Sequence, residues 1–223
     1  MAVFADRDDA GHALIAPLCQ LLAHADLAAE RPVLLPLPRG GVPVAARIAD
    51  ELQLPMYALP VRKVGVPNHA ELAMGALAGL GDTTEVMRHH AVIEACRVPS
   101  AAVESAIANE SDALRLLLHR YYGDGPAPDL SGRFAIIVDD GLATGATMTA
   151  AVRLTKRVGA RRVAVAVPVG SASARQRLAE EADDVLCLRE PVPFSAVSVG
   201  YRRFGPPSEQ SVLDALRRHA ETA

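Results

Sequence analysis

The stretch FAIIVDDGLATGATMTAAV, from Phe134 to Val152, decides the fold prediction for this chain of 223 residues. An uninterrupted apolar run, 134–138, leads directly into two adjacent carboxylates, Asp139 and Asp140. A loop of glycine, alanine and threonine follows, and after it apolar residues recur at helical spacing. Continuous apolar runs of this length are typical of strands that are buried on both faces of a parallel sheet. We therefore expect a buried strand, a short loop and a helix, with two negative charges at the carboxyl end of the strand.

Similar units continue on both sides of this stretch. Strands that alternate with helices predict an α/β fold with an open parallel sheet flanked by helices. Residues 64–88, with scattered glycines and weak periodicity, predict a long loop or a hairpin excursion. The tail from Glu190 onward is expected to be an element added to the sheet and not another strand–helix unit. The other expected strands are 33–38, 56–61, 162–167 and 185–188, and the expected helices lie within 12–25 and at about 42–52, 100–121, 146–158 and 173–182.

Length and composition limit the class of protein. The chain can form one large domain, or one domain with a small appendage. Its formal net charge is -3 at pH 7, so it has no basic footprint for nucleic acid. Three widely spaced cysteines, Cys19, Cys96 and Cys187, argue against a disulfide framework or a zinc site and fit a reducing compartment. Since there is no signal-peptide pattern and no run of roughly 18 apolar residues, we expect a cytoplasmic protein without a membrane partner.

The predicted strand end has the chemistry of a ligand site. Ligands of open parallel sheets bind beyond the carboxyl ends of the strands, where Asp139 and Asp140 are expected. The loop 142–147 opens a helix whose first N–H groups are unpaired and partly positive, so a phosphate can approach its backbone beside the hydroxyl groups of Thr144 and Thr147. Carboxylates repel phosphate and suit hydroxyl groups, such as a ribose diol, or a metal ion. A sugar phosphate therefore satisfies both halves of the motif.

Known motifs of other kinds match only part of this stretch. An acidic helix cap without a ligand accounts for the carboxylates but not for the loop of small residues behind them. The Gly-Lys-Ser/Thr ending of a Walker loop is absent, and no GxGxxG follows a first strand. Receiver domains also pair acidic residues, but without a loop of threonine and glycine.

The segment IIVDDGLATGATM, 136–148, resembles the phosphoribosyl pyrophosphate (PRPP) signature of the type I phosphoribosyltransferases. It is similar to the DDGLATGATM form in a subgroup of predicted phosphoribosyltransferases, and a looser resemblance covers most of the chain. The resemblance implies an enzyme that transfers the 5-phosphoribosyl group of PRPP to a nitrogenous acceptor and releases pyrophosphate. Asp139 and Asp140 would hold the ribose hydroxyls and, through water, the cofactor Mg²⁺. The 5′-phosphate would be wrapped by Ala143, Thr144, Gly145, Ala146 and Thr147.

A second strand–loop–helix junction, PLPRGGVPVA at 36–45, offers the features that a pyrophosphate needs. Arg39 places a positive charge beside Gly40 and Gly41, which tolerate unusual backbone angles. An ordinary helix-start turn with a surface arginine is the alternative. The resemblance implies a pyrophosphate-binding loop here, often with an unusual peptide geometry.

Further candidates lie at the end of the second expected strand and beyond it. Arg62 and Lys63 are adjacent cations that could bind pyrophosphate, although a solvated surface pair would give the same pattern. By the resemblance, segment 64–88 is a flexible loop that closes over the reaction, with Glu71 and Gly75 as its candidate residues. Such closure would exclude water from a reactive glycosyl centre.

The resemblance also divides the chain into a core, 1–189, and a C-terminal hood segment with a helix, 190–223. The hood would cover the acceptor. Phe194 and Tyr201 could stack on an acceptor base or pack in the core of the hood, and the sequence leaves both open.

The expected catalytic residues are Asp139 and Asp140, which would orient the ribose, and Arg39 and Lys63, which would stabilise charge on the leaving pyrophosphate. A nucleobase is the expected acceptor, but purines, pyrimidines and other amines remain open. The alternative is a non-catalytic regulatory protein that binds PRPP. Such a protein would have less need of the cations Arg39, Arg62 and Lys63 and of a mobile loop. Because the family often forms dimers, a homodimer is a further expectation.

Overall fold

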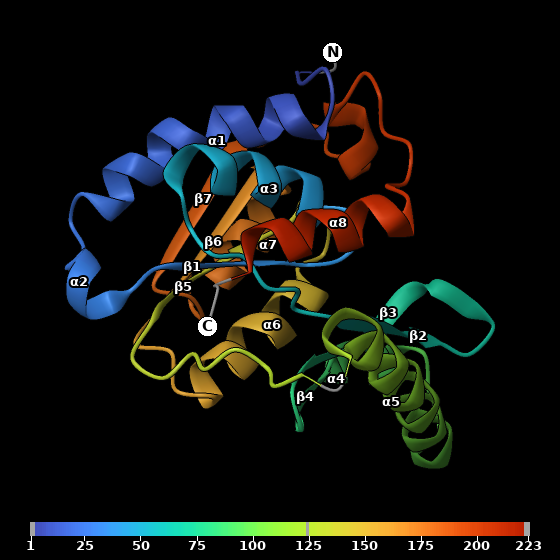
Figure 1. Cartoon of the computed structure of the whole chain (residues 1–223). Coiled ribbons are helices and arrows are strands. Elements are labelled where there is room, and N and C mark those ends of the chain that lie inside the picture. The colour runs from blue at the N-terminus through green and yellow to red at the C-terminus, as the bar shows by residue number, and fades with distance from the viewer. Residues whose placement is uncertain (1–2, 124, 221–223) are drawn as a thin grey trace.

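A four-stranded parallel sheet forms the centre of the protein (Figure 1). The computed structural model describes residues 3–123 and 125–220. Within this part of the chain the strand order is β1-β5-β6-β7, and all neighbouring strands are parallel. The open parallel sheet expected from the sequence is therefore confirmed. Its strands are β1 (Val33–Pro36), β5 (Phe134–Val138), β6 (Arg162–Val169) and β7 (Asp184–Arg189).

Helices cover both faces of this sheet. Successive side chains of a strand point to opposite faces, and because the side chains on both faces are apolar, both faces must be buried. In β5, Ile136 packs in one hydrophobic cluster and Ile137 in the other. A single helical turn, α2 (Leu27–Glu30), leads into β1. One face is covered by α1 (Arg7–Leu22), α3 (Gly41–Leu52) and α8 (Glu209–His219), and the other by α6 (Ala146–Arg157) and α7 (Ala172–Leu178).

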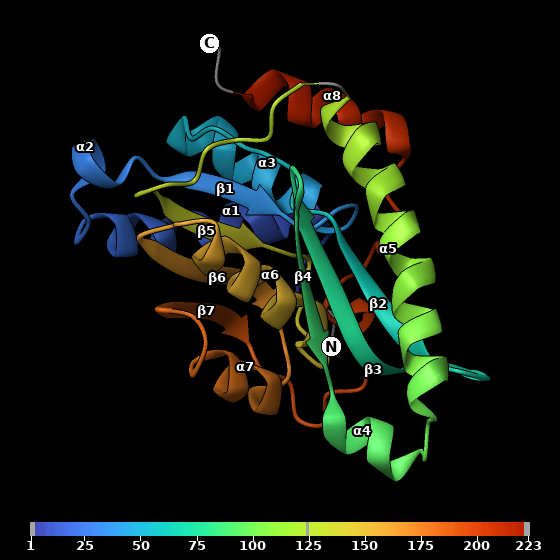
Figure 2. The ribbon, with the colours of Figure 1, turned by 90° about the horizontal axis from the view of Figure 1, so that it is seen from below.

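A second, antiparallel sheet stands beside the first (Figure 2). Both faces of its middle strand are buried. Met74 and Leu77 join a cluster with the long helix of this unit, whereas Ala76 and Ala78 join the cluster that contains α6. The elements are β2 (Val61–Val66), β3 (His69–Leu80), β4 (Thr83–Arg88), α4 (His90–Ala95) and α5 (Ser100–Tyr122).

This sheet corrects one expectation from the sequence. The long loop considered for residues 64–88 is wrong, and the hairpin alternative is confirmed. The signal was weak because helices cover both faces of β3, which removes the alternation of apolar and polar residues. Small residues such as Ala76 and Ala78 add little apolar signal of their own. Movement of this segment as a flexible loop stays a prediction.

The strand expected at 56–61 is also displaced. This segment runs extended beside β1, where the N–H of Tyr57 bonds to the carbonyl of Leu34 (3.0 Å). The regular strand, β2, begins only where the expected strand ends. Pro55 and Pro60 lack the N–H donors that a regular ladder needs. The position of the segment was therefore predicted correctly, but its bounds as a strand were not.

The N-terminal segment of the described chain lies against the tail (Figure 1). Phe4 donates its N–H to the carbonyl of Gly200 (2.9 Å) and accepts the N–H of Arg202 (2.9 Å). The tail passes through a short 3₁₀ helix, η1 (Val197–Gly200), before α8 packs on α3. In the described part of the chain, no helix has both the length and the apolar character of a membrane span.

We predict that Leu14→Ala lowers the free energy of unfolding by about 2–5 kcal/mol, because truncating a fully buried side chain leaves a cavity. Leu14 belongs to the cluster that α1 shares with α3. The matched change Leu116→Ala, on a side chain that is 68% exposed, should cost less than about 0.5 kcal/mol. Urea unfolding followed by circular dichroism measures both variants, and equal costs would contradict the packing of α1.

Candidate active site

A cavity of about 370 Å³ lies at the carboxyl end of β5. Its walls come from the loop after β5, the start of α6, the antiparallel sheet and the tail. Segments that are distant in the sequence thus meet where ligands of parallel sheets bind. Of the residues expected at the site, the cavity is lined by Lys63, Glu71, Asp139, Asp140, Ala143, Thr144, Gly145, Ala146 and Thr147.

Two poorly solvated carboxylates lie together in this cavity. The Oδ1 atom of Asp139 accepts a hydrogen bond from the backbone N–H of Asp140 (2.9 Å). Burial, together with the neighbouring charge of Asp140, raises the pKa of Asp139 well above its ordinary value of 3.8. Burial also raises the pKa of Asp140, and Arg7 opposes this effect. Such a pair favours a partner that donates hydroxyl hydrogens or carries positive charge.

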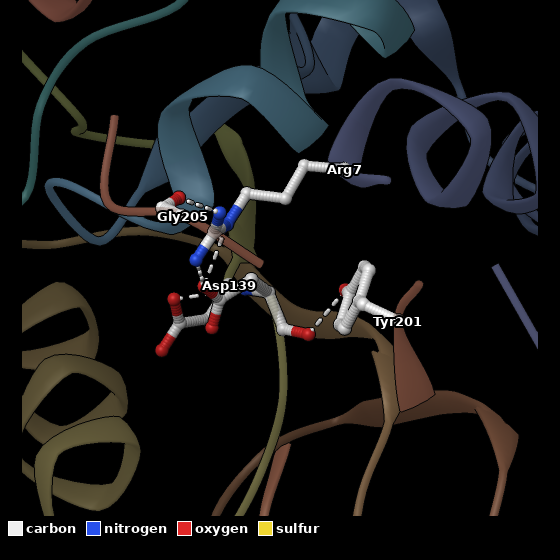
Figure 3. Close-up of polar contacts among 5 residues, drawn as sticks. Arg7, Asp139, Tyr201 and Gly205 are labelled. Carbon is white, nitrogen blue, oxygen red and sulfur yellow. Dashed lines mark hydrogen bonds and ion pairs between the residues drawn. The ribbon is translucent and has the colours of Figure 1, made fainter. Parts of the chain in front are cut away.

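Arg7, which the sequence did not indicate, pairs with Asp140 (Figure 3). Its Nε and Nη2 atoms lie 2.8 and 2.7 Å from Oδ2 of Asp140, and its Nη1 donates to the carbonyl of Gly205 (2.7 Å). The guanidinium lies 4.0 Å from the ring centroid of Phe204. In the sequence Arg7 belongs to a charged helix start, which carries no signal of a buried role.

The loop before α6 is held from behind. Gly145 precedes the helix with φ +82°, a left-handed conformation that favours glycine. Ser171 donates its hydroxyl to the carbonyl of Ala143 (2.8 Å), and Arg177 donates to the carbonyl of Thr144 (3.0 Å). These bonds occupy loop carbonyls and leave the opening N–H groups of α6 for a ligand. Neither donor was expected from the sequence, although Ser171 fits the residue preference of an N-cap and caps α7.

The glycines of the second loop pack against the carboxylates. A Cβ atom at Gly40 would lie 2.2 Å from Oδ2 of Asp140, and one at Gly41 would lie 2.4 Å from the carbonyl oxygen of Val138. The loops after β1 and β5 are therefore in direct contact, and side chains larger than glycine would force them apart. The peptide bond between Pro38 and Arg39 is cis, which agrees with the unusual geometry expected here.

The adjacent cations Arg62 and Lys63 point in different directions. Arg62 pairs through Nε with Oε2 of Glu110 on α5 (2.7 Å). Lys63 lines the cavity, where its Nζ lies 3.8 Å from Oε2 of Glu71. The structure thus brings Lys63 to the carboxylates and keeps Arg62 on the side of α5.

Other expected residues also do not line the cavity, namely Arg39, Gly40, Gly41, Gly75, Phe194 and Tyr201. The side chain of Arg39 is exposed to solvent. Gly75 lies within β3, where an added Cβ atom would come 2.6 Å from the carbonyl oxygen of Met87. Gly75 therefore permits the close packing of β3 on β4.

The aromatic residues of the tail pack together beside the motif. Tyr201 is 5% exposed, its ring centroid lies 5.0 Å from that of Phe204, and its hydroxyl donates to the carbonyl of Asp140 (2.5 Å). Phe194 packs partly buried against the same cluster. The tail reaches the cavity through Val197, a residue that was not expected at the site from the sequence.

The donor set fits a Mg²⁺ ion that binds with its substrate. Within residues 3–123 and 125–220, no group of three or more His, Cys, Asp or Glu side chains could hold a metal ion. Asp139 and Asp140 supply two carboxylates, and Arg7 occupies one oxygen of the second. Mg²⁺ commonly uses one or two carboxylates together with water and substrate phosphates. Asp139 and Asp140 suit that mode of binding.

Comparison with known proteins shows the family. The sequence pattern of the phosphoribosyl transferase domain matches residues 12–202. The chain belongs to the phosphoribosyl transferase domain family. Over 218 residues it is 40% identical to a Mycobacterium tuberculosis protein whose name describes a candidate phosphoribosyl transferase. That match covers 98% of the chain but 47% of the relative, so the chain spans about half the length of this curated relative.

A solved structure has the same fold. The crystal structure of TT1426 from Thermus thermophilus has a TM-score of 0.76 and 39% identity to the chain. The match covers 98% of this chain and 100% of that one. The resemblance to type I phosphoribosyltransferases is therefore confirmed, together with the α/β fold. At the level of the family, membership supports phosphoribosyl transfer as the class of activity.

We predict that Lys63→Met weakens pyrophosphate binding about 10-fold or more, because a charged donor at the cavity is lost. Arg62→Met removes a neighbouring cation that pairs with Glu110, and should change the dissociation constant less than about 2-fold. Isothermal titration of both variants with pyrophosphate and Mg²⁺ gives the comparison. A larger loss in the Arg62 variant would show that the orientation of these cations is wrong.

We predict that Asp139→Asn stabilises the protein at neutral pH. The pKa of Asp139 in the folded protein lies above that of the unfolded chain, so stability present at low pH is lost as the pH rises from 3.8 toward the raised pKa. Asparagine does not ionise and avoids this loss. The melting temperature of the variant should exceed that of the wild type at pH 7 and approach it at pH 4. Parallel melting curves across this range would contradict the raised pKa.

Proposed function

We propose that the protein transfers the 5-phosphoribosyl group of PRPP to a nitrogenous acceptor and releases pyrophosphate. The contact between two strand-end loops carries this proposal. Gly40 of the first loop packs on Asp140 of the second, and the second loop continues into the start of α6. PRPP carries a pyrophosphate, a diol and a 5′-phosphate in this order. The two loops offer a glycine-rich backbone, two carboxylates and a helix start in the same order.

Each part of PRPP then has a proposed partner. The 5′-phosphate binds the loop Ala143–Thr147, where N–H groups and threonine hydroxyls are available. The ribose hydroxyls donate to Asp139 and Asp140. The pyrophosphate binds the backbone of Gly40 and Gly41 and the side chains of Arg39 and Lys63. Arg62, which pairs with Glu110, plays no direct part in this arrangement.

The proposed reaction breaks the bond between C1 of the ribose and the pyrophosphate oxygen, and the electron pair of this bond leaves with pyrophosphate. The lone pair of the acceptor nitrogen forms the new bond to C1, and this nitrogen releases its proton to solvent. Positive charge develops on the ribose ring, as in other glycosyl transfers. Asp139 and Asp140 stabilise that charge and hold the ring in place. Lys63 and Arg39 stabilise the charge that grows on the pyrophosphate. When bound, Mg²⁺ supplies further neutralisation of the pyrophosphate.

The walls of the cavity support a transferase over a hydrolase. Lys63, Glu71 and Ala73 from the antiparallel sheet face the motif, and Val197 closes it from the tail. Movement of residues 64–88 toward the ribose would exclude water from C1. The contact of Val197 supports a tail that covers the acceptor, for which a nucleobase is our proposal. Lys63 in the cavity also favours the enzyme over a PRPP-binding regulatory protein.

A ³¹P NMR time course of PRPP, Mg²⁺, the protein and a pool of nucleobases tests this function. We expect pyrophosphate and a new sugar phosphate to appear together, and only when bases are present. Asp139→Asn and Asp140→Asn should each lower turnover roughly 100-fold, since one charge-stabilising group is worth about 3 kcal/mol. Asp112→Asn, on an exposed side chain of α5, should retain wild-type turnover.

Two results would contradict the transferase proposal or the role that it gives to Asp139. PRPP signals that broaden with the wild-type protein, but stay unchanged in area with every base, would favour the regulatory function. Full turnover in Asp139→Asn would remove that carboxylate from the mechanism.

A further inference from the structure

Arg7 is held at its place from several sides. It is the first residue of α1, whose N-cap Asp6 accepts the N–H of Asp9 (3.1 Å). Its guanidinium bonds to Asp140 and to the carbonyl of Gly205, and it lies over the ring of Phe204. The residue is 9% exposed. A buried arginine is costly without such partners, so this side chain has little freedom to leave Asp140.

The ion pair treats the two carboxylate oxygens of Asp140 differently. Both Nε and Nη2 of Arg7 approach Oδ2, which is also the atom that a side chain at Gly40 would strike. Oδ1 takes no part in this ion pair. Arg7 therefore fixes the rotation of the carboxylate and determines which oxygen is held against the loop of Gly40.

We propose that Arg7 is a positioning residue of the PRPP site, which orients Asp140 so that its Oδ1 atom accepts a ribose hydroxyl. This inference rests on the proposed function. Arg7 does not line the cavity, and its Nε, Nη1 and Nη2 atoms already donate to Asp140 and to the carbonyl of Gly205, so it acts through Asp140 and not on the ligand. Because Arg7 also bonds to Gly205, the orientation of Asp140 depends on the contact between the tail and the start of α1.

The positive charge of Arg7 also favours binding of PRPP at this site. Asp139 and Asp140 alone would place two negative charges beside the phosphates of PRPP and would repel them. Arg7 compensates one of these charges at a distance of 2.7 Å. The motif can then hold hydroxyl groups without repelling the rest of the ligand.

A purely structural role for Arg7, as a link between α1 and the tail, is the alternative. The chain offers a matched control for it in Arg203. Arg203 joins the same two segments by pairing with Asp6, but its side chain is 76% exposed and it does not line the cavity. Removing Arg203 weakens the link and leaves Asp140 untouched.

The test is isothermal titration with ribose 5-phosphate and with inorganic phosphate, after PRPP binding by the wild type has been measured. Ribose 5-phosphate carries the hydroxyls, and inorganic phosphate reports on the helix-start loop alone. We expect Arg7→Met to weaken ribose 5-phosphate about 10-fold or more and inorganic phosphate less than about 2-fold. Arg7→Lys should recover part of the loss, and Arg203→Met should resemble the wild type.

A double-mutant cycle separates positioning from folding. If Arg7 acts through Asp140, the variant with both Arg7→Met and Asp140→Asn loses no more affinity for ribose 5-phosphate than Asp140→Asn alone. Additive losses, equal losses for both ligands, or wild-type affinity in Arg7→Met would overturn the inference. If Arg7→Met does not fold, the Arg7→Lys variant provides the test. Lysine cannot place two donors on Oδ2 of Asp140 as arginine does. Wild-type affinity of Arg7→Lys for ribose 5-phosphate would therefore overturn the inference.

Failure of the proposed function gives a different result. A wild-type protein that binds neither PRPP nor ribose 5-phosphate would overturn the proposed function and this inference together. A wild type that binds both ligands, beside an Arg7→Met variant that binds them equally well, would overturn the inference alone.

Discussion

The close approach of two loops, at the ends of β1 and β5, is the constraint on which the site depends. These strands are parallel neighbours, so their outgoing loops leave the sheet at the same edge. The N–H of Leu37 bonds to the carbonyl of Val138 (2.9 Å), and the contacts of Gly40 and Gly41 leave no room for a Cβ atom. A ligand that spans the loops meets bare backbone on one side and carboxylates on the other. The sheet topology therefore sets the distance between the two loops of the site, independently of their side chains.

Burial of two carboxylates opposes folding, and the chain compensates for only part of that cost. Arg7 pairs with Asp140, while the pKa of Asp139 remains raised well above its ordinary value. Groups that are left unfavourable in the folded state are typical of functional sites, where binding requires them. The hydrogen bond from Tyr201 to the backbone of Asp140 adds rigidity without adding charge. The motif is thus fixed in position but incompletely neutralised, which suits a site that must bind hydroxyl groups.

The features of the fold and of the site that could be predicted from the sequence are those that arise from residues close together in the chain. The apolar run 134–138 and the loop behind it are local patterns, so the strand, the helix start and the carboxylates could be found. Arg7 could not, because its contact with Asp140 joins positions 133 residues apart and leaves no local pattern. The divergence of Arg62 and Lys63 was predictable in principle, since adjacent side chains of a strand point to opposite faces. Their assignment to one site overlooked that rule.

The hydrogen bonds around Asp140 also join segments that are synthesised at different times. Arg7 leaves the ribosome 133 residues before Asp140, and Tyr201 follows 61 residues after it. The link between Arg7 and Gly205 spans 198 residues, so nearly all of the described chain must be made before the guanidinium gains its second partner. Parallel strands can pair earlier, because β6 follows β5 after a single helix. The β5–β6 pair therefore needs only a short stretch of chain, whereas the full set of contacts around Asp140 needs segments from near both ends of the described chain.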